Sequence, residues 1–205
     1  MKVLGRGWQY TVYDLGGGRV LKRHNSALAA CYIMLHDSFP YIHHPLWVLP
    51  RLHREAQAAA CRSLSTLRSH TLEPWMLANP TLRDDDSYEQ DKVTPLDLLL
   101  RSASREEGER LIDAFVAFNR ELVSAHLIDK SFDIGNNFGL DSQRRVVLID
   151  LGELVCEREA IEAQMRARIW SAHYVLSGVP QRLHAYFLAK MDEAFMSTPQ
   201  SGVLS

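Results

Sequence analysis

The stretch Asn137-Phe-Gly-Leu-Asp-Ser-Gln-Arg-Arg-Val-Val-Leu-Ile-Asp150-Leu-Gly152 decides the fold that we expect for this chain. Residues 141–144 predict a polar turn, and the β-branched run at 145–149 is typical of a strand that carries Asp150 back beside Asn137. A carboxylate and an amide oxygen are ligands that Mg²⁺ prefers, so the pair predicts a metal site suited to binding phosphates. The alternative is an ordinary hairpin that ends in Asp-Leu-Gly.

The amino terminus carries a glycine pattern that is typical of a phosphate-binding loop. In Gly5-Arg-Gly7-Trp-Gln-Tyr10-Thr-Val12, two glycines let the backbone approach phosphate oxygens, and Val12 would cover an adenine base. Residues 15–18 predict a turn between two strands, and Lys22 ends the returning strand, where it would neutralise the α- and β-phosphates. The alternative is a common glycine-rich hairpin followed by a surface lysine.

The first third of the chain predicts strands followed by helices. Residues 1–22 are typical of a β-meander, and residues 25–36 are typical of a helix. Residues 51–68 repeat apolar side chains with helical period, and Glu55 lies on the first turns of that segment. Prolines interrupt the chain between the two helical segments at Pro40, Pro45 and Pro50.

The middle of the chain predicts a hairpin, a link and a long helix. Residues 75–82 and 88–93 are expected to pair around a turn at 83–86, and Thr94-Pro95 would link two lobes. Ser104-Arg-Glu-Glu107 is a capping box that predicts the start of a helix. The apolar face of this helix comprises Leu111, Ala114, Phe115, Phe118 and Leu122.

The end of the chain predicts two further helices, at 157–176 and 180–195, which would form the floor of the site. We interpret Trp170 as a core aromatic residue, and the alternative is a substrate anchor.

The glycine loop, the strand lysine and the Asn/Asp pair follow one another along the chain as they do in kinases. With these motifs the chain resembles the protein-kinase-like superfamily, which includes the aminoglycoside phosphotransferases. The resemblance covers about residues 1–155. Segments 131–136 and 149–153 are similar to the small bacterial YrbL-type proteins, and the compact size is similar to the minimal type III effector kinases. The residues that carry the resemblance are Gly5, Gly7, Val12, Lys22, Glu55, Asp133, Asn137, Asp150 and Gly152.

The resemblance implies roles for residues outside the metal pair. Glu55 would pair with Lys22 and position it, although a solvated glutamate on a helix face is the alternative. The backbone around Val93, in the link between the lobes, would bond to the adenine edge. Asn137 and Asp150 would hold Mg²⁺.

The chain departs from the family pattern at two positions. Tyr10 replaces the third glycine of the loop. A kinase catalytic loop has an Asp five residues before the Asn, but here Phe132 occupies that position and Asp133 lies four residues before Asn137. Either the loop is one residue shorter and Asp133 orients the acceptor hydroxyl, or the general base is absent. Asp129 is the next candidate for that role.

Composition excludes several classes of function. With a net charge of -2 and no Lys/Arg-rich run, the sequence has no nucleic-acid signature. The three cysteines, at 31, 61 and 156, are far apart and in no metal spacing, which indicates buried reduced thiols. No run of about 18 apolar residues exists, and the first residues lack a secretory core, so we expect a cytoplasmic protein without membrane insertion.

Together, these patterns predict an α+β, minimal two-lobed protein-kinase-like fold with a truncated helical C-lobe. Residues 1–94 would form the N-lobe and residues 95–205 the C-lobe. The expected function is an ATP- and Mg²⁺-dependent transferase, an atypical Ser/Thr protein kinase acting as a monomer on a protein substrate, including a bacterial effector acting on a host protein. The alternatives are a nucleotide-binding pseudokinase and a small-molecule kinase of aminoglycoside or sugar type.

Overall fold

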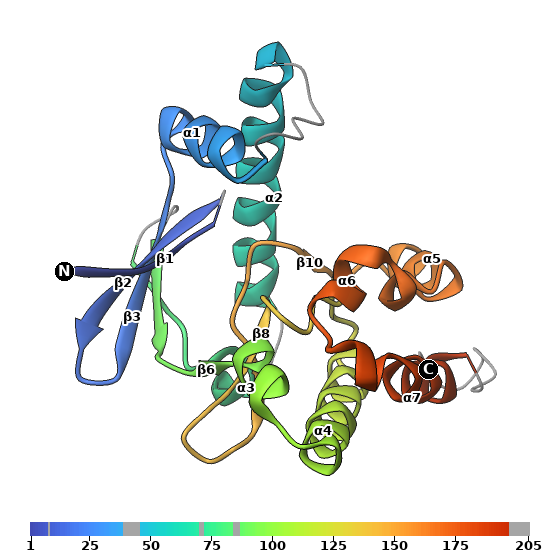
Figure 1. The fold of residues 1–205 in the computed structure, drawn as a ribbon. Helices are drawn as coiled ribbons and strands as arrows, with labels where there is room; N and C mark the ends of the chain where they lie inside the picture. Colours follow the sequence, from blue (N-terminus) through green and yellow to red (C-terminus); the bar gives the residue numbers. More distant parts are fainter. Residues whose placement is uncertain (8, 39–45, 70–71, 84–86, 197–205) are drawn as a thin grey trace.

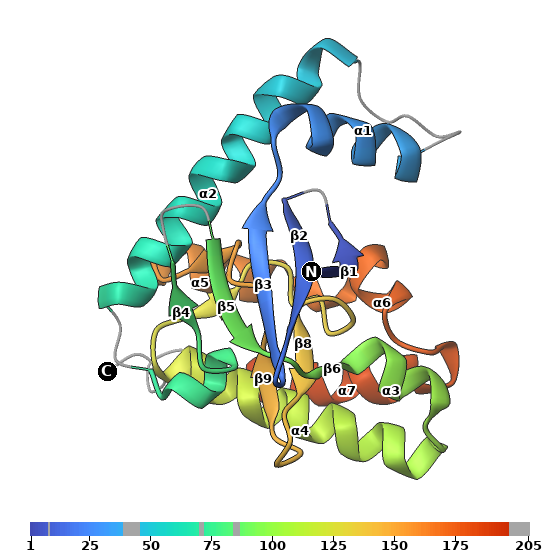
Figure 2. The same ribbon diagram turned by 90° about the vertical axis from the view of Figure 1, so that its left-hand side faces the viewer.

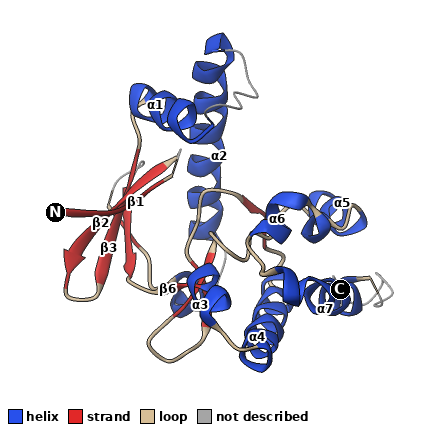
Figure 3. Ribbon diagram, in the orientation of Figure 1, coloured by secondary structure: helices blue, strands red, loops and turns tan. Residues whose placement is uncertain are grey.

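A computed structural model of the chain describes residues 1–7, 9–38, 46–69, 72–83 and 87–196. A five-stranded antiparallel sheet lies on one side of the molecule, and helices α3 to α7 lie on the other (Figure 1). Figure 3 shows that strands dominate the first part of the chain and helices the last. The described elements confirm the α+β class.

The sheet has the strand order β1-β2-β3-β5-β4. Its first three strands form the predicted meander, and Gly16, Gly17 and Gly18 at the β2–β3 turn all have positive φ, which glycine adopts without strain. In β3, Lys22 pairs with Tyr88 of β5. The strands are β1 (Lys2–Arg6), β2 (Tyr10–Gly16), β3 (Arg19–His24), β4 (Thr81–Leu82) and β5 (Ser87–Asp91).

Two helices, α1 (Ala27–Ser38) and α2 (Leu49–Ser69), follow the meander; α1 lies beyond the end of the sheet, and α2 runs from there diagonally down past β5 and β4 (Figure 2). Both predicted helical segments are confirmed. Pro50 lies in the first turn of α2 rather than in a break, because the first turn of a helix needs no amide donor from a proline. Pro40 and Pro45 lie outside the described residues.

The predicted hairpin at 75–82 and 88–93 is confirmed in part. Strands β4 and β5 pair, but residues Pro74–Leu77 form a 3-10 helix (η2) instead of a strand. Pro74 at its start favours this tight turn, and Ala78 ends it in the left-handed conformation. Of the expected turn at 83–86, residues 84–86 lie outside the described residues.

The Ser104 cap of the predicted capping box and the site hairpin are confirmed. Ser104 Oγ accepts a hydrogen bond of 3.2 Å from Glu107 N at the start of α4 (Arg105–Ser124). Strands β8 (Phe138–Leu140) and β9 (Val146–Leu148) form the hairpin, and β6 (Thr94–Pro95) pairs with β8. Strand β7 (Ile128–Asp129) pairs with β10 (Leu154–Val155), and α3 (Leu96–Ser102) follows β6.

The continuous helix predicted at 157–176 is wrong. The chain forms α5 (Arg158–Arg166), turns at Arg168, where φ is 48°, and continues through η3 (Ile169–Ser171) and α6 (His173–Ser177). The turn lets the fully buried Trp170 pack against Phe132 and Phe195, which confirms the core interpretation of Trp170. The second predicted helix comprises η4 (Gln181–Leu183) and α7 (His184–Phe195).

All three cysteines are free, but Cys61 is exposed and Cys31 and Cys156 are half-buried, so the expectation of buried thiols is wrong. No helix within the described residues has the length and apolar character needed to span a membrane.

Candidate functional site

One cavity of about 730 Å³ is lined by the Gly5–Gly7 turn (the glycine turn), by Lys22 of β3 and by the Asn137–Asp150 pair. The cavity lies between strands β1 to β3 and the loops that follow β7 and β9. Within the described chain, Glu55 and Val93 are the two predicted site residues that do not line it. The predicted residues that do line it are Gly5, Gly7, Val12, Lys22, Asp133, Asn137 and Asp150.

Backbone hydrogen bonds hold Asn137 and Asp150 together. The carbonyl oxygen of Asn137 accepts from Ile149 N at 2.8 Å and from Asp150 N at 3.3 Å. Asp150 Oδ1 accepts from Gly152 N at 2.9 Å. The hairpin therefore brings the two predicted metal ligands side by side, as the sequence pattern predicted.

A buried carboxylate orients the Asn137 amide. Asn137 Nδ2 donates to Asp129 Oδ1 at 3.0 Å and to Ser131 Oγ at 2.9 Å. No hydrogen bond reaches Asn137 Oδ1 from any described residue. The amide oxygen is therefore available as a ligand next to the Asp150 carboxylate, and both are the hard oxygen donors that Mg²⁺ prefers.

The protein donors at this position are few. The described residues contain no group of three or more His, Cys, Asp or Glu side chains that could hold a metal ion. Mg²⁺ commonly uses one or two carboxylates together with waters and substrate phosphates. The Asn137–Asp150 pair supplies one carboxylate and one amide oxygen.

Asp129 is fully buried and accepts three hydrogen bonds. Besides Asn137, its donors are Ser131 Oγ at 2.9 Å and the backbone amide of Asp133 at 3.2 Å. Burial raises the pKa of the Asp129 carboxyl to about 7, and the nearby Asp150 charge also raises it, against the two side-chain hydrogen bonds. Asp129 is thus the titratable group that organises the loop.

Asp133, the predicted catalytic carboxylate, lines the cavity, but its own loop occupies both of its oxygens. Oδ1 accepts from Gly135 N at 3.1 Å and from Asn136 N at 3.2 Å, and Oδ2 accepts from Asn136 Nδ2 at 2.9 Å. Such bonds are typical of an Asp at the start of a tight turn. In this conformation, the Asp133 carboxylate stabilises its own loop.

Lys22 is buried and does not meet Glu55. Its Nζ donates to the carbonyl oxygen of Ile149 at 2.5 Å, and it lies 5.8 Å from the centre of the Tyr88 ring. Burial lowers the pKa of Lys22, and the negative charge of Asp150 opposes this shift. The lysine is therefore directed at the Asp150 loop.

The expected Glu55–Lys22 ion pair is absent from the described contacts. The Glu55 side chain is 63% exposed and lies 3.5 Å from Arg51 on the same helix. The face of α2 that is buried carries Ala56, Ala60 and Ser63 instead. Helical geometry turns Glu55 to solvent, because residues on the buried face recur every three or four positions.

Val93 does not line the cavity, and the expected backbone contact with adenine stays a prediction. Its side chain packs against Gly139, where an added Cβ would lie 2.6 Å from Val93 Cγ2. The neighbouring Lys92 amide donates to Gly18 O at 2.7 Å. The link is thus tied to the β2–β3 turn and to β8.

Two residues that the sequence interpretation missed shape the glycine turn. Asn25 Nδ2 donates to Gly7 O at 2.7 Å, its backbone amide donates to Gln9 O at 2.8 Å, and its Oδ1 accepts from Thr11 Oγ1 at 2.6 Å. Gln9 is 5% exposed, lines the cavity and contacts Gly152. Its Nε2 has no hydrogen-bond partner among the described residues.

The opposite end of the cavity was also missed. Lys130, Glu153, Gln164 and Tyr174 line it, and Tyr174 OH donates to Ser131 O at 3.4 Å. Burial raises the pKa of Glu153, Asp150 adds to the rise, and Lys130 opposes it. The only available signal was position in the sequence, since Lys130 and Glu153 immediately follow Asp129 and Gly152.

Neither a protein-family model nor a curated protein matches this chain. The chemistry of the site must therefore be argued from its geometry.

Proposed function

We propose that the chain is an ATP-dependent phosphotransferase with a minimal two-lobed protein-kinase-like fold, whose lobes are residues 1–94 and 95–205. One observation carries this proposal: Lys22, Asn137 and Asp150 line a single cavity beneath the Gly5–Gly7 turn. These are the residue types that phosphoryl transfer needs, in the order that kinases have. A volume of about 730 Å³ is in the range of small-molecule sites.

In this proposal, each residue acts on the nucleotide or on the acceptor. Lys22 exchanges the Ile149 carbonyl for phosphate oxygens, and the glycines of the Gly5–Gly7 turn let the backbone approach the phosphates. Asn137 and Asp150 would hold Mg²⁺, which neutralises phosphate charge when bound. The buried Asp129 keeps the Asn137 oxygen directed at that position.

The acceptor is a hydroxyl, and we propose a Ser or Thr of a protein. Two carboxylates compete for the role of general base. Asp133 lines the cavity but is bonded to its own turn, whereas Asp129 is buried beneath Asn137. Asp133 fits the base role once Asn136 releases its carboxylate, because only Asp133 of the two lines the cavity.

A nucleotide-binding regulatory protein without transferase activity is the second candidate. Two observations favour it: the Asp133 carboxylate is already satisfied, and the α2 glutamate faces solvent instead of Lys22. Both departures reduce catalysis more than nucleotide binding.

Thermal unfolding with and without millimolar Mg·ATP tests the proposal. A ligand that binds only the folded state raises Tm by mass action. At a ligand concentration of 100 times Kd, the free energy of unfolding rises by about 2.7 kcal/mol. Asp150→Asn should remove most of this increase, and Lys22→Met should reduce it. Glu121→Gln, a change at an exposed position of α4, is the matched control and should leave the increase intact. An unchanged wild-type Tm would contradict the proposal.

A further inference from the structure

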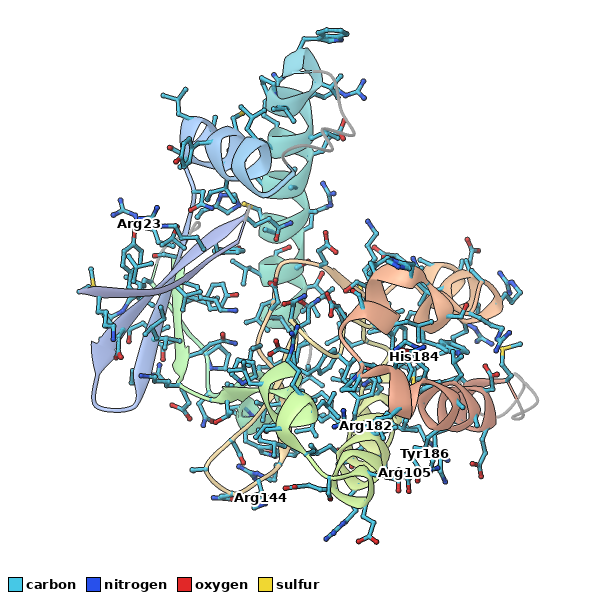
Figure 4. All side chains as sticks on the ribbon, viewed as in Figure 1. Arg23, Arg105, Arg144, Arg182, His184 and Tyr186 are labelled. Atoms are coloured by element: carbon cyan, nitrogen blue, oxygen red, sulfur yellow. The ribbon has the colours of Figure 1, made fainter. Side chains whose placement is uncertain are left out.

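A second cavity, of about 400 Å³, lies where β3 enters α1. It is on the outer face of the sheet, because Arg23 lines it and the preceding residue, Lys22, points to the main cavity, and consecutive strand residues face opposite sides. Figure 4 shows Arg23 projecting from the sheet, away from the side of helices α3 to α7. Its lining includes Arg6, Thr11, Tyr13, Arg23, Asn25 and Tyr32.

The charge of this outer groove is positive and uncompensated. Arg6 pairs with Thr11, and Thr11 pairs with Arg23, so the two arginines flank one threonine on one face of the sheet. Neither guanidinium forms an ion pair or hydrogen bond with another described residue. Among the described residues, no Asp or Glu lines the groove, although the whole chain has a net charge of -2. The groove is therefore complementary to carboxylates, which arginine binds in bidentate geometry.

The groove borders the candidate active site at Arg6. Arg6 lines both cavities, and Asn25, at the floor of the groove, holds the backbone of Gly7 and Gln9. On α1, Tyr32 lines the groove and is 64% exposed, and Leu28, four residues before it, is 86% exposed. A bound segment would therefore meet arginines on the sheet, apolar side chains on α1, and the entrance to the phosphate end of the main cavity.

We propose that the outer groove docks an acidic segment of the protein that supplies the acceptor hydroxyl. This inference rests on the proposed function. Carboxylates of the segment pair with Arg6 and Arg23, and an apolar side chain packs on Leu28 and Tyr32. The exposed Leu28 next to Tyr32 on α1 favours a peptide over a nucleic acid, whose backbone has no apolar side chain to pack on it.

Fluorescence anisotropy of the full chain with a labelled peptide tests the docking site. The probe is a twelve-residue synthetic peptide with one Ser, two Leu and a run of Asp and Glu, and the comparison peptide has Lys at the acidic positions. Arg23→Glu should weaken binding of the acidic peptide at least about fivefold, because attraction becomes repulsion. Arg120→Glu makes the same charge change on an exposed position of α4 and should preserve affinity.

Two controls separate this inference from the proposed function. Stabilisation by Mg·ATP should be the same in wild type and Arg23→Glu. If Mg·ATP does not stabilise the wild-type protein, the nucleotide site itself is contradicted. With that stabilisation intact, equal binding by Arg23→Glu and Arg120→Glu overturns the docking site, as does failure of wild type to bind. Equal affinity for both peptides, or tighter binding of a ten-nucleotide RNA, also overturns it.

Discussion

Burial determines the orientation and hydrogen bonding of individual polar groups at the candidate site. Asn137 exposes its amide oxygen because Asp129 and Ser131 occupy the amide nitrogen. Asp129 can do this because it is removed from water, and a buried carboxylate must have its lone pairs satisfied. The geometry of the pair that would bind metal is therefore decided by a residue that does not line the cavity.

Stability should depend on pH through Asp129. Its folded-state pKa of about 7 lies above the ordinary value of 3.8. The folded protein thus holds the proton more tightly than the unfolded chain, so this contribution is fully present below about pH 4 and is lost as the pH rises through about 7. Its size is on the order of a few kcal/mol.

Urea unfolding of wild type and Asp129→Asn between pH 4.5 and pH 8 measures this effect. The variant lacks the titrating proton, so the stability difference between the two proteins should change across this range, with wild type losing more as pH rises. Parallel pH profiles for the two proteins would show that Asp129 does not titrate in this window.

We expect the buried Gln9 side chain to lower the free energy of unfolding when no ligand is bound. Its buried Nε2 has no partner among the described residues, and an unsatisfied buried donor costs about 1–3 kcal/mol. Gln9→Met keeps the length of the side chain and removes the donor. The free energy of unfolding in urea should therefore stay equal or rise by about 1 kcal/mol. A clear loss of stability would mean that the amide is bonded in solution.

At the scale of single elements, helix α4 shows how local sequence determines structure. Ser104 caps its first turn, and its buried residues pack beneath the site hairpin, where Phe115 and Phe118 contact Phe138. The hairpin that carries Asn137 and Asp150 therefore packs on a helix whose start is predicted by four consecutive residues, Ser104 to Glu107.

Ser104→Ala should destabilise the protein by about 1 kcal/mol, because the side chain satisfies an otherwise unpaired amide at the helix start. Chemical denaturation measures the loss. Ser124→Ala is the matched control, since Ser124 lies at the exposed carboxyl end of the same helix and bonds only to Glu121 O. Equal losses in both variants would argue against a specific role of the cap.

At the scale of the whole molecule, the sheet separates two cavities with different charge. The main cavity combines Lys22 with Asp133, Asp150 and Glu153, whereas arginines alone carry the charged groups of the outer groove. Nucleotide and acceptor protein would thus approach from different faces of the sheet, on either side of Arg6, which lines both cavities.

Transfer of label from radioactive ATP to proteins of a bacterial or eukaryotic lysate distinguishes the two candidate functions. If Asp133 is the base, Asp133→Ala should reduce transfer by about 10²-fold or more, the effect of losing a positioned base. Asp150→Asn should abolish transfer because it removes the carboxylate ligand of the metal.

The control for this assay is nucleotide binding. Asp133→Ala should keep the Mg·ATP stabilisation that Asp150→Asn loses. Transfer that survives Asp133→Ala would transfer the base role to Asp129. An absence of transfer in wild type together with intact binding would favour the regulatory protein.

The sequence alone determined the features that depend on neighbouring residues. Local backbone preferences and short-range hydrogen bonds explain three of these features. They are the β2–β3 turn at Gly16–Gly18, the Ser104 cap and the hairpin that joins Asn137 to Asp150. Those preferences act over a few residues, so the pattern predicted them correctly. The meander that carries Lys22 follows for the same reason.

Only the tertiary structure decided which side chains face one another across elements. The helical period of 51–68 predicted α2 but not its rotation, and packing on the small residues Ala56 and Ala60 turned Glu55 to solvent. Likewise, burial of Trp170 broke a helix that the periodicity had favoured. Long-range packing selected these contacts, because burying apolar surface outweighs a local preference worth less than about 1 kcal/mol per residue.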